Sequence, residues 1–252
     1  MVQIVIGLLA SLIPSLAFYF WLKKLDKEKP GYEETVRKSL IYGMLSPLPV
    51  VGAAFVFTIV SNLLGLRNAG SIVRKAVGAF VTAALFEEAS KFIMFRRVLQ
   101  KSDCACSWMN VTAFMTLVGI GFGIPEAVEY SIGANVIQIL VRGVTLMHGG
   151  YGFIMGYFYG KGRAEKNSSW YAAAFLIPFL LHGTYDFTLS ESVLALNENI
   201  AFIPVTLAIL AVITLILMIV FFIKAPKNET YTAPLMPEKK TAVPVSEQPA
   251  DK

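Results

Sequence analysis

Apolar stretches of about twenty residues recur along the chain, and this length is what a helix needs to cross the hydrocarbon core of a bilayer. Of its 252 residues, 56% are hydrophobic and only 15% are charged, whereas a soluble domain usually has about 25% charged residues. The pattern therefore predicts an all-α fold, a polytopic membrane bundle of about seven transmembrane helices within residues 1–223. The expected spans are 2–22, 39–65, 76–95, 108–131, 134–160, 169–187 and 200–223.

The basic residues gather in alternate loops, which indicates an orientation. Of 22 Lys and Arg residues, 17 fall in loops 23–38, 96–107 and 161–168 and in the C-terminal tail. The opposite side has only Arg67, Arg74 and Lys75. Because basic loops stay cytoplasmic, we expect an outside N-terminus and a cytoplasmic C-terminus.

This distribution also accounts for the net charge of +5 without a nucleic-acid partner. The expected partner is the lipid bilayer, and the expected location is the cell membrane, with the chain as a multi-pass protein. Residues 224–252 are rich in Pro, Lys, Glu and Thr, and are expected to form a disordered cytoplasmic tail. Within the second span, Ser46-Pro47-Leu48-Pro49 is expected to break or kink the helix.

Charged side chains lie inside the apolar spans, where each costs about 2.5–3.5 kcal/mol at the bilayer centre. Seven formal charges facing lipid would cost about 20 kcal/mol, which exceeds the net stability of a typical fold. We therefore expect them to converge on an interior site, together with the two histidines of the chain. These residues are Glu87, Glu88, Lys91, Glu126, Glu129, Arg142, His148, His182 and Asp186.

The adjacent acids Glu87 and Glu88 cannot have the same role. Both lie within one helical turn of Lys91, at i,i+4 and i,i+3, so an ion pair with Lys91 is expected. Neighbouring residues on a helix point about 100° apart. One carboxylate can therefore face a cavity while the other braces a neighbouring helix, and the sequence does not distinguish which is which.

The two histidines and the acids are residue types typical of a metal site. His182 and Asp186 share a helix face at i,i+4, and His148 lies in the middle of a span. Two histidines and a carboxylate form a common catalytic zinc ligand set, and a further carboxylate can take a proton from the water. A cofactor is therefore expected, a divalent metal with zinc as the first candidate.

Depth along the helices provides a check on this grouping. At 1.5 Å per residue, Glu87, His148 and His182 lie roughly 13–20 Å from the cytoplasmic edges of their spans and can share one level. Glu126 lies roughly 25 Å in, nearer the outer face. A break at Gly123–Pro125, or a tilted helix, is therefore needed to bring Glu126 to the others.

The motifs and their order resemble the PrsW family of intramembrane proteases, distant relatives of the CAAX-processing type II proteases. The resemblance covers roughly residues 80–188. It rests on Glu87-Glu88-Ala89-Ser90-Lys91, on Gly121-Phe122-Gly123-Ile124-Pro125-Glu126, on Arg142 followed by His148, and on His182-Gly183-Thr184-Tyr185-Asp186. It implies hydrolysis of a peptide bond in a membrane-anchored protein, such as an anti-sigma-factor-like regulator.

The mechanism that we expect combines these residues. Glu87 or Glu88 activates a water molecule as general base. His148 and His182 bind a divalent metal, or stabilise the oxyanion if no metal is present, and Glu126 is either a third metal ligand or a group that supports the ligands. The supporting residues are Lys91, Arg142 and Asp186, with Asp186 orienting His182. Two alternatives remain open from the sequence: a proton-coupled transporter, because intramembrane acids and histidines also form proton relays, and a non-catalytic scaffold with a protease-like core.

Overall fold

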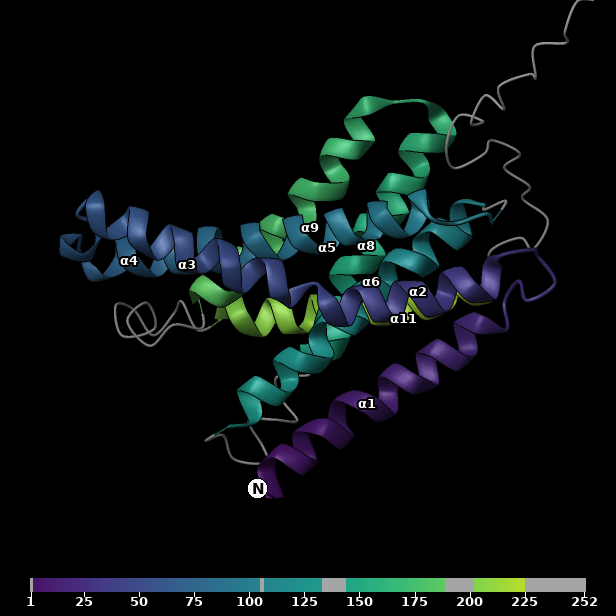
Figure 1. Cartoon of the computed structure of the whole chain (residues 1–252), viewed down its shortest axis with the longest axis horizontal. Coiled ribbons are helices and arrows are strands. Elements are labelled where there is room, and N and C mark those ends of the chain that lie inside the picture. Colours follow the sequence, from purple (N-terminus) through teal and green to yellow (C-terminus); the bar gives the residue numbers. More distant parts are fainter. Residues whose placement is uncertain (1, 105–106, 133–143, 189–201, 225–252) are drawn as a thin grey trace, which may run out of the picture.

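The computed structural model of the chain describes residues 2–104, 107–132, 144–188 and 202–224, and these form helices and turns with no strand among them. Figure 1 shows the arrangement. The helices are α1 (Val2–Lys23), α2 (Tyr32–Leu45), α3 (Pro47–Leu63), α4 (Ser71–Val77), the π-helix η2 (Gly78–Leu85), α5 (Phe86–Gln100), α6 (Trp108–Ser131), α8 (Val144–Glu165), α9 (Ser168–Thr188) and α11 (Phe202–Lys224), with the short 3₁₀ turn η1 (Leu66–Asn68) after α3. The expected tail 224–252 lies outside the described residues beyond Lys224, as does Arg142.

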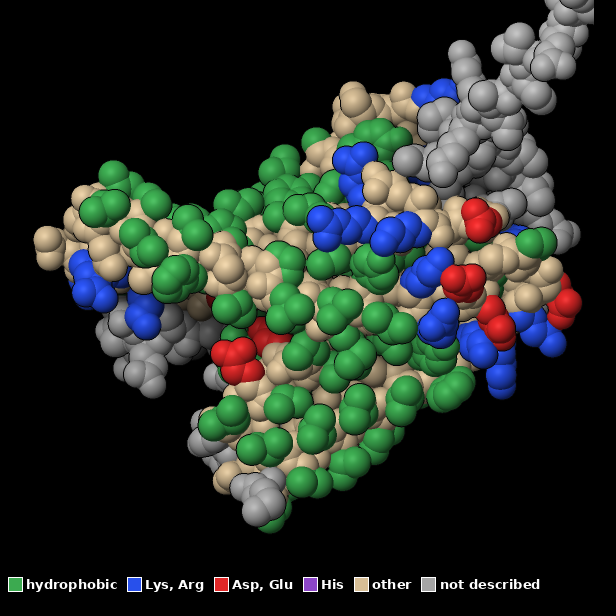
Figure 2. All heavy atoms as spheres, viewed as in Figure 1, with side chains coloured by type: hydrophobic (Ala, Val, Ile, Leu, Met, Phe, Trp, Pro, Cys, Tyr) green, Lys and Arg blue, Asp and Glu red, His purple; other side chains and the backbone are tan. Residues whose placement is uncertain are grey.

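Among the described residues, three stretches of helix are long and apolar enough to cross a membrane: Val2–Lys23, Tyr32–Leu63 and Trp108–Ser131. The chain is thus an integral membrane protein with an all-helical fold, as its sequence predicts. The count of seven spans and the orientation remain predictions. Figure 2 shows many apolar side chains on the visible surface, and basic side chains gathered mainly at the end of the bundle near the α1–α2 connection.

The expected break in the second span is confirmed. Helix α2 ends at Leu45 and α3 begins at Pro47, where proline is tolerated because the first residue of a helix needs no intrahelical N–H bond. The expected loop 23–38 is wrong from Tyr32 onwards, because α2 already begins there. Two acids in its first turn suit the positive end of the helix dipole, and the buried Tyr32 hydroxyl donates to the Leu22 carbonyl at 2.7 Å.

The third expected span is longer than predicted and contains an unusual segment. Helices α4, η2 and α5 follow one another from Ser71 to Gln100, and the π-helical η2 ends directly before the two glutamates. π-Helical turns are rare in proteins, and those that occur often lie at functional sites. Here η2 packs along α9, where the Phe80 ring lies so close to Gly183 that a side chain there would collide with it. This contact places α5 beside His182.

Glycines allow α6 and α8 to approach backbone to backbone. A Cβ added to Gly152 would lie 2.5 Å from the Met115 carbonyl oxygen, and one added to Gly156 would lie 2.9 Å from the Thr112 Cα. On α6, Gly119 lies directly against the carbonyl of His148. Gly152 and Gly156 are spaced at i,i+4 and so lie on one face of α8, where small residues let another helix approach closely.

We expect Gly119→Ala to destabilise the protein by about 1–3 kcal/mol, because overpacked cores must shift backbone to accommodate added atoms. The methyl group would meet the His148 carbonyl, which no side-chain rotation can move. The matched control is Gly52→Ala in α3, since a Cβ at Gly52 has nothing within 4 Å. Unfolding of both variants in detergent, followed by circular dichroism, checks this. Equal stabilities would contradict the close approach.

Candidate active site

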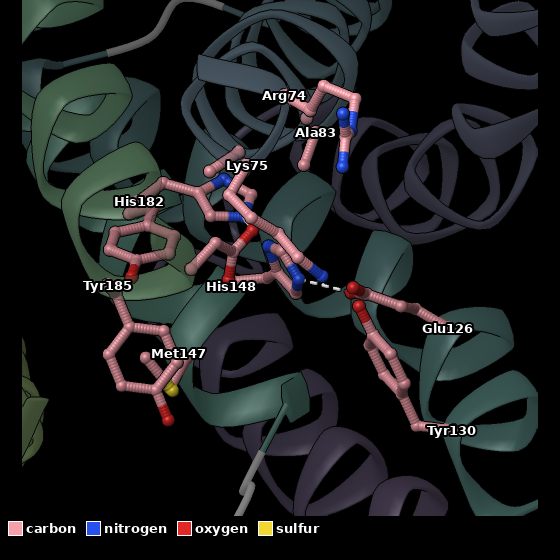
Figure 3. A pocket seen from close by; sticks show the side chains of 13 residues that line it. Arg74, Lys75, Ala83, Glu126, Tyr130, Met147, His148, His182 and Tyr185 are labelled. Atoms are coloured by element: carbon pink, nitrogen blue, oxygen red, sulfur yellow. Dashed lines mark ion pairs between the residues drawn. The ribbon is translucent and has the colours of Figure 1, made fainter. Parts of the chain in front are cut away.

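A pocket of about 620 Å³ lies where α4, η2, α6, α8 and α9 meet. Its lining includes Lys75, Glu126, His148, Tyr151, His182 and Asp186. Figure 3 shows the two imidazoles and the Glu126 carboxylate directed toward one another within it. The structure therefore brings together most of the expected residues, which lie far apart in the sequence, as the cost of charge in a membrane predicts. The expectation is wrong for Glu129, which is exposed and does not line the pocket.

Glu88 is fully buried and joins two helices. Its Oε1 accepts hydrogen bonds from Lys91 Nζ at 2.6 Å and lies 2.8 Å from His182 Nδ1. Lys91, also fully buried, lies 2.9 Å from His148 Nδ1 and 4.6 Å from the centre of the Phe122 ring. The buried ion pair therefore lies behind both imidazoles and holds each by its Nδ1 atom.

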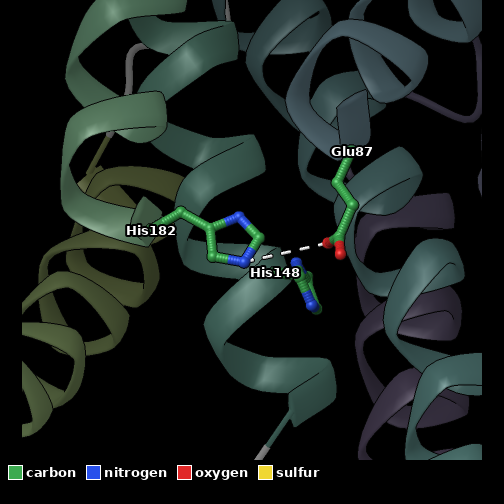
Figure 4. Close-up of side chains that lie close together, drawn as sticks. All are labelled: Glu87, His148 and His182. Atoms are coloured by element: carbon green, nitrogen blue, oxygen red, sulfur yellow. Dashed lines mark ion pairs between the residues drawn. The ribbon is translucent and has the colours of Figure 1, made fainter. Parts of the chain in front are cut away.

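Glu87 occupies the other face of the same turn. Its Oε2 lies 3.8 Å from His182 Nε2, and this oxygen has no hydrogen-bond partner among the described residues. Figure 4 shows Glu87 extending from α5 toward both imidazoles. One potential ligand atom from each of Glu87, His148 and His182 lies within 4.8 Å of the others. Glu87 thus faces the Nε2 atom of His182, on the other side of the ring from the Nδ1 atom that Glu88 contacts.

Glu126 reaches the site by the second of the two expected routes, an oblique helix, and not by a break at Gly123–Pro125. Helix α6 continues from Trp108 to Ser131 through Pro125, and Glu126 Oε2 contacts His148 Nε2 directly. The depth estimate assumes helices that run along the membrane normal. Figure 1 shows α6 running obliquely to α2 and α11, so a residue far along α6 need not lie at a different level from His148.

Asp186 lies near Nε2 of His182, whereas Glu88 lies near Nδ1 of the same ring. The Oδ2 atom of Asp186 is 3.2 Å from His182 Nε2, the same atom that faces Glu87. Glu88 at Nδ1 therefore has the position from which a carboxylate fixes the orientation of an imidazole, which is the role that we had expected for Asp186. Two carboxylates around one Nε2 favour a positive charge there, from a proton or from a cation.

The donor set fits a divalent cation. Zinc ligands lie about 2.0–2.2 Å from the ion, so no two of them are more than about 4.4 Å apart. The 4.8 Å spread of the candidate atoms on Glu87, His148 and His182 needs only small side-chain shifts to reach that range. The carboxylate of Glu88 behind His182 is the usual support for a ligating imidazole.

Sequence reasoning did not single out Tyr151, which lies in the centre of the site. Its ring stacks on His182 with centroids 5.1 Å apart and 17° between the planes, and it meets His148 edge-on at 5.9 Å. A signal existed, because Tyr151 follows His148 by three residues and so shares its helix face. Lys75, also in the pocket lining, follows from no motif.

Known proteins match most of the chain. A family model described as PrsW family intramembrane metalloprotease matches residues 34–222. Proteins named Protease PrsW match at 28% identity from Geobacillus kaustophilus (71% of this chain, 78% of the relative), at 29% from Oceanobacillus iheyensis (71% and 81%) and at 27% from Bacillus subtilis (72% and 81%). No solved structure matches the chain. Together with the convergent site, these matches show that the chain belongs to the PrsW family of intramembrane proteases.

Proposed function

We propose that the chain hydrolyses a peptide bond of a membrane-anchored protein with a water molecule that Glu87 activates. The observation that supports this most directly is the Glu87 carboxylate, which faces the ring nitrogens with an unpartnered oxygen. A general base must lie within hydrogen-bond reach of the proton that it takes, either directly or through one water. Glu88 also has an unpartnered Oε2, but it is less suited, because it is fully buried and Lys91 and His182 already share its Oε1.

His148 and His182, with Glu126 beside His148, would hold a divalent cation, for which zinc is our proposal. When bound, such a cation acidifies water and polarises a carbonyl. Glu87 accepts the proton of the attacking water and then returns it to the leaving amine nitrogen. Glu88 keeps the His182 ring in place through Nδ1, and Lys91 compensates the buried charge of Glu88.

For the substrate, we propose a single-span membrane protein, with an anti-sigma-factor-like regulator as the example. Relatives of the chain are named as proteases, which implies a protein substrate. The pocket of about 620 Å³ is too small for a folded domain but accommodates a few extended residues. We therefore expect cleavage next to the membrane-spanning helix of the substrate, where the end of that helix can unwind and enter the pocket.

The test is cleavage in proteoliposomes of a panel of single-span fusion proteins from the host genome, analysed by mass spectrometry of the products. We expect defined cleavage near the membrane boundary, loss of cleavage with a chelator, and bound metal in the wild type but not in His148→Ala/His182→Ala. Metal in neither protein would overturn the metal assignment. Intact substrates together with pH-dependent solute flux would instead support a transporter.

A further inference from the structure

Tyr151 is held rigidly in the pocket by its ring. The ring stacks on His182 and meets His148 edge-on, and only 8% of the residue is exposed. Because the residue lines the pocket, this small exposed part faces the cavity in which the imidazoles lie. A side chain held in this way points its polar atom in a fixed direction.

The hydroxyl of Tyr151 has no hydrogen-bond partner among the described residues, whereas the imidazole nitrogens around it are engaged. His148 contacts Lys91 through Nδ1 and Glu126 through Nε2. His182 contacts Glu88 through Nδ1 and faces acids through Nε2. The phenol is therefore an uncommitted donor at the centre of the site.

The two cationic side chains that line the pocket, Arg74 and Lys75, are less suited than Tyr151 to donate a hydrogen bond to a bound substrate. Arg74 donates through Nη1 to the carbonyls of Arg67 and Ala69, and so caps the turn before its own helix. Lys75 is exposed and no neighbour holds its ammonium in place within the described residues. A catalytic donor gains its effect from being fixed before the reaction begins, and Tyr151 meets that condition.

We propose that Tyr151 is a further catalytic residue, whose hydroxyl donates a hydrogen bond to the carbonyl oxygen of the scissile peptide and to the oxyanion that replaces it. This rests on the proposed hydrolysis. The water oxygen bonds to the carbonyl carbon, the π electron pair moves to the carbonyl oxygen, and the water proton goes to Glu87. When the C–N bond breaks, the carbonyl forms again and the amine nitrogen takes the proton.

The Tyr151 hydroxyl stabilises the charge on oxygen throughout this sequence without transferring its own proton. Its effect is therefore strongest in the transition state, when the negative charge is largest. Removing the hydroxyl should lower kcat and leave KM nearly unchanged, because the peptide oxygen of the bound substrate is a weaker acceptor than the oxyanion.

The test compares Tyr151→Phe with the wild type on a single-span fusion that the wild type cleaves. Phenylalanine keeps the ring stacked on His182 and removes only the oxygen. We expect kcat to fall by about 10²-fold, at the lower end of the range for one oxyanion donor, with KM, metal content and unfolding midpoint unchanged. Tyr157→Phe is the matched control on α8, outside the pocket, and should retain wild-type kcat.

Each outcome decides one of the two proposals. Wild-type kcat in Tyr151→Phe overturns the catalytic assignment, and so does a loss of kcat accompanied by a lower unfolding midpoint or loss of metal, because the hydroxyl would then be structural. Tyr151→Leu removes the stacking as well and should lower stability, which shows that the ring and the hydroxyl act separately. Absence of cleavage by the wild type overturns the proposed hydrolysis and, with it, the role of Tyr151.

Discussion

Glu87→Gln is expected to lower the rate of peptide cleavage by about 10³-fold, within the usual contribution of a general base. The amide has nearly the same shape as the carboxylate but cannot accept the proton of the attacking water. Its neighbours should stay in place, because Glu87 Oε2 has no hydrogen-bond partner among the described residues that the substitution would break. Single-turnover cleavage of a reconstituted single-span fusion protein measures the change.

Metal content separates a base from a ligand in this variant. The carboxylate lies close enough to both imidazoles for either role, and we assign it the base. Glu87→Gln should therefore keep its metal while losing activity, whereas Glu126→Gln should bind metal more weakly. If Glu87→Gln loses metal and activity together, Glu87 is a ligand, and the base must be sought elsewhere. Wild-type rates in Glu87→Gln would refute both roles.

Lys91→Met is expected to destabilise the fold by about 3–5 kcal/mol, the usual cost of removing one partner of a buried ion pair. Both side chains of the Lys91–Glu88 pair are fully buried. Without the ammonium, Glu88 would have only the imidazole of His182 to compensate its charge. The double variant Lys91→Met/Glu88→Gln should regain most of the loss, since both substituted side chains are neutral and neither leaves an uncompensated buried charge. Reversible unfolding in mixed micelles measures all three proteins.

An exposed ion pair on the same protein serves as the control. Lys38 and Glu34 are 2.7 Å apart at i,i+4, with 27% and 57% of their side chains exposed. Lys38→Met should change stability by no more than about 1 kcal/mol, because water already solvates such pairs and the further hydrogen bond of Lys38 to the Lys101 carbonyl is also exposed. Similar losses of unfolding free energy in Lys38→Met and Lys91→Met would mean that water reaches the interior of the bundle, and that burial does not explain the destabilisation of Lys91→Met.

The existence of the site could be predicted from the sequence, but its internal arrangement could not. The cost of charge in lipid requires Glu87, Glu88 and both histidines to meet, whatever the details of packing. The separate placement of the two glutamates also follows from helix geometry. Which one faces the cavity depends on where α9 lies relative to α5, and no local pattern encodes that.

The misplaced details share a physical origin in tertiary geometry. The sequence leaves open whether a helix break or a tilted helix brings Glu126 to the site, and the oblique course of α6 relative to α2 and α11 decides for the tilt (Figure 1). Nothing in the residue types of Gly78–Leu85 indicates that this segment is π-helical, whereas a proline such as Pro47 marks the start of a helix. Tyr151 resembles any aromatic residue of an apolar helix until its stacking on His182 is seen.

The backbone contact between Gly119 and His148 makes the two sides of the pocket mechanically unequal. Helices α6 and α8 meet through main-chain atoms, so we expect His148 and Glu126 to behave as parts of one rigid unit. On the opposite side of the pocket, η2 and α9 contact each other through aromatic rings such as those of Phe80 and Phe179. Contacts between side-chain rings can adjust more easily than contacts between main-chain atoms. We therefore expect any widening of the pocket to lengthen the hydrogen bond between Lys91 and His148, so the distance between these two residues would report it.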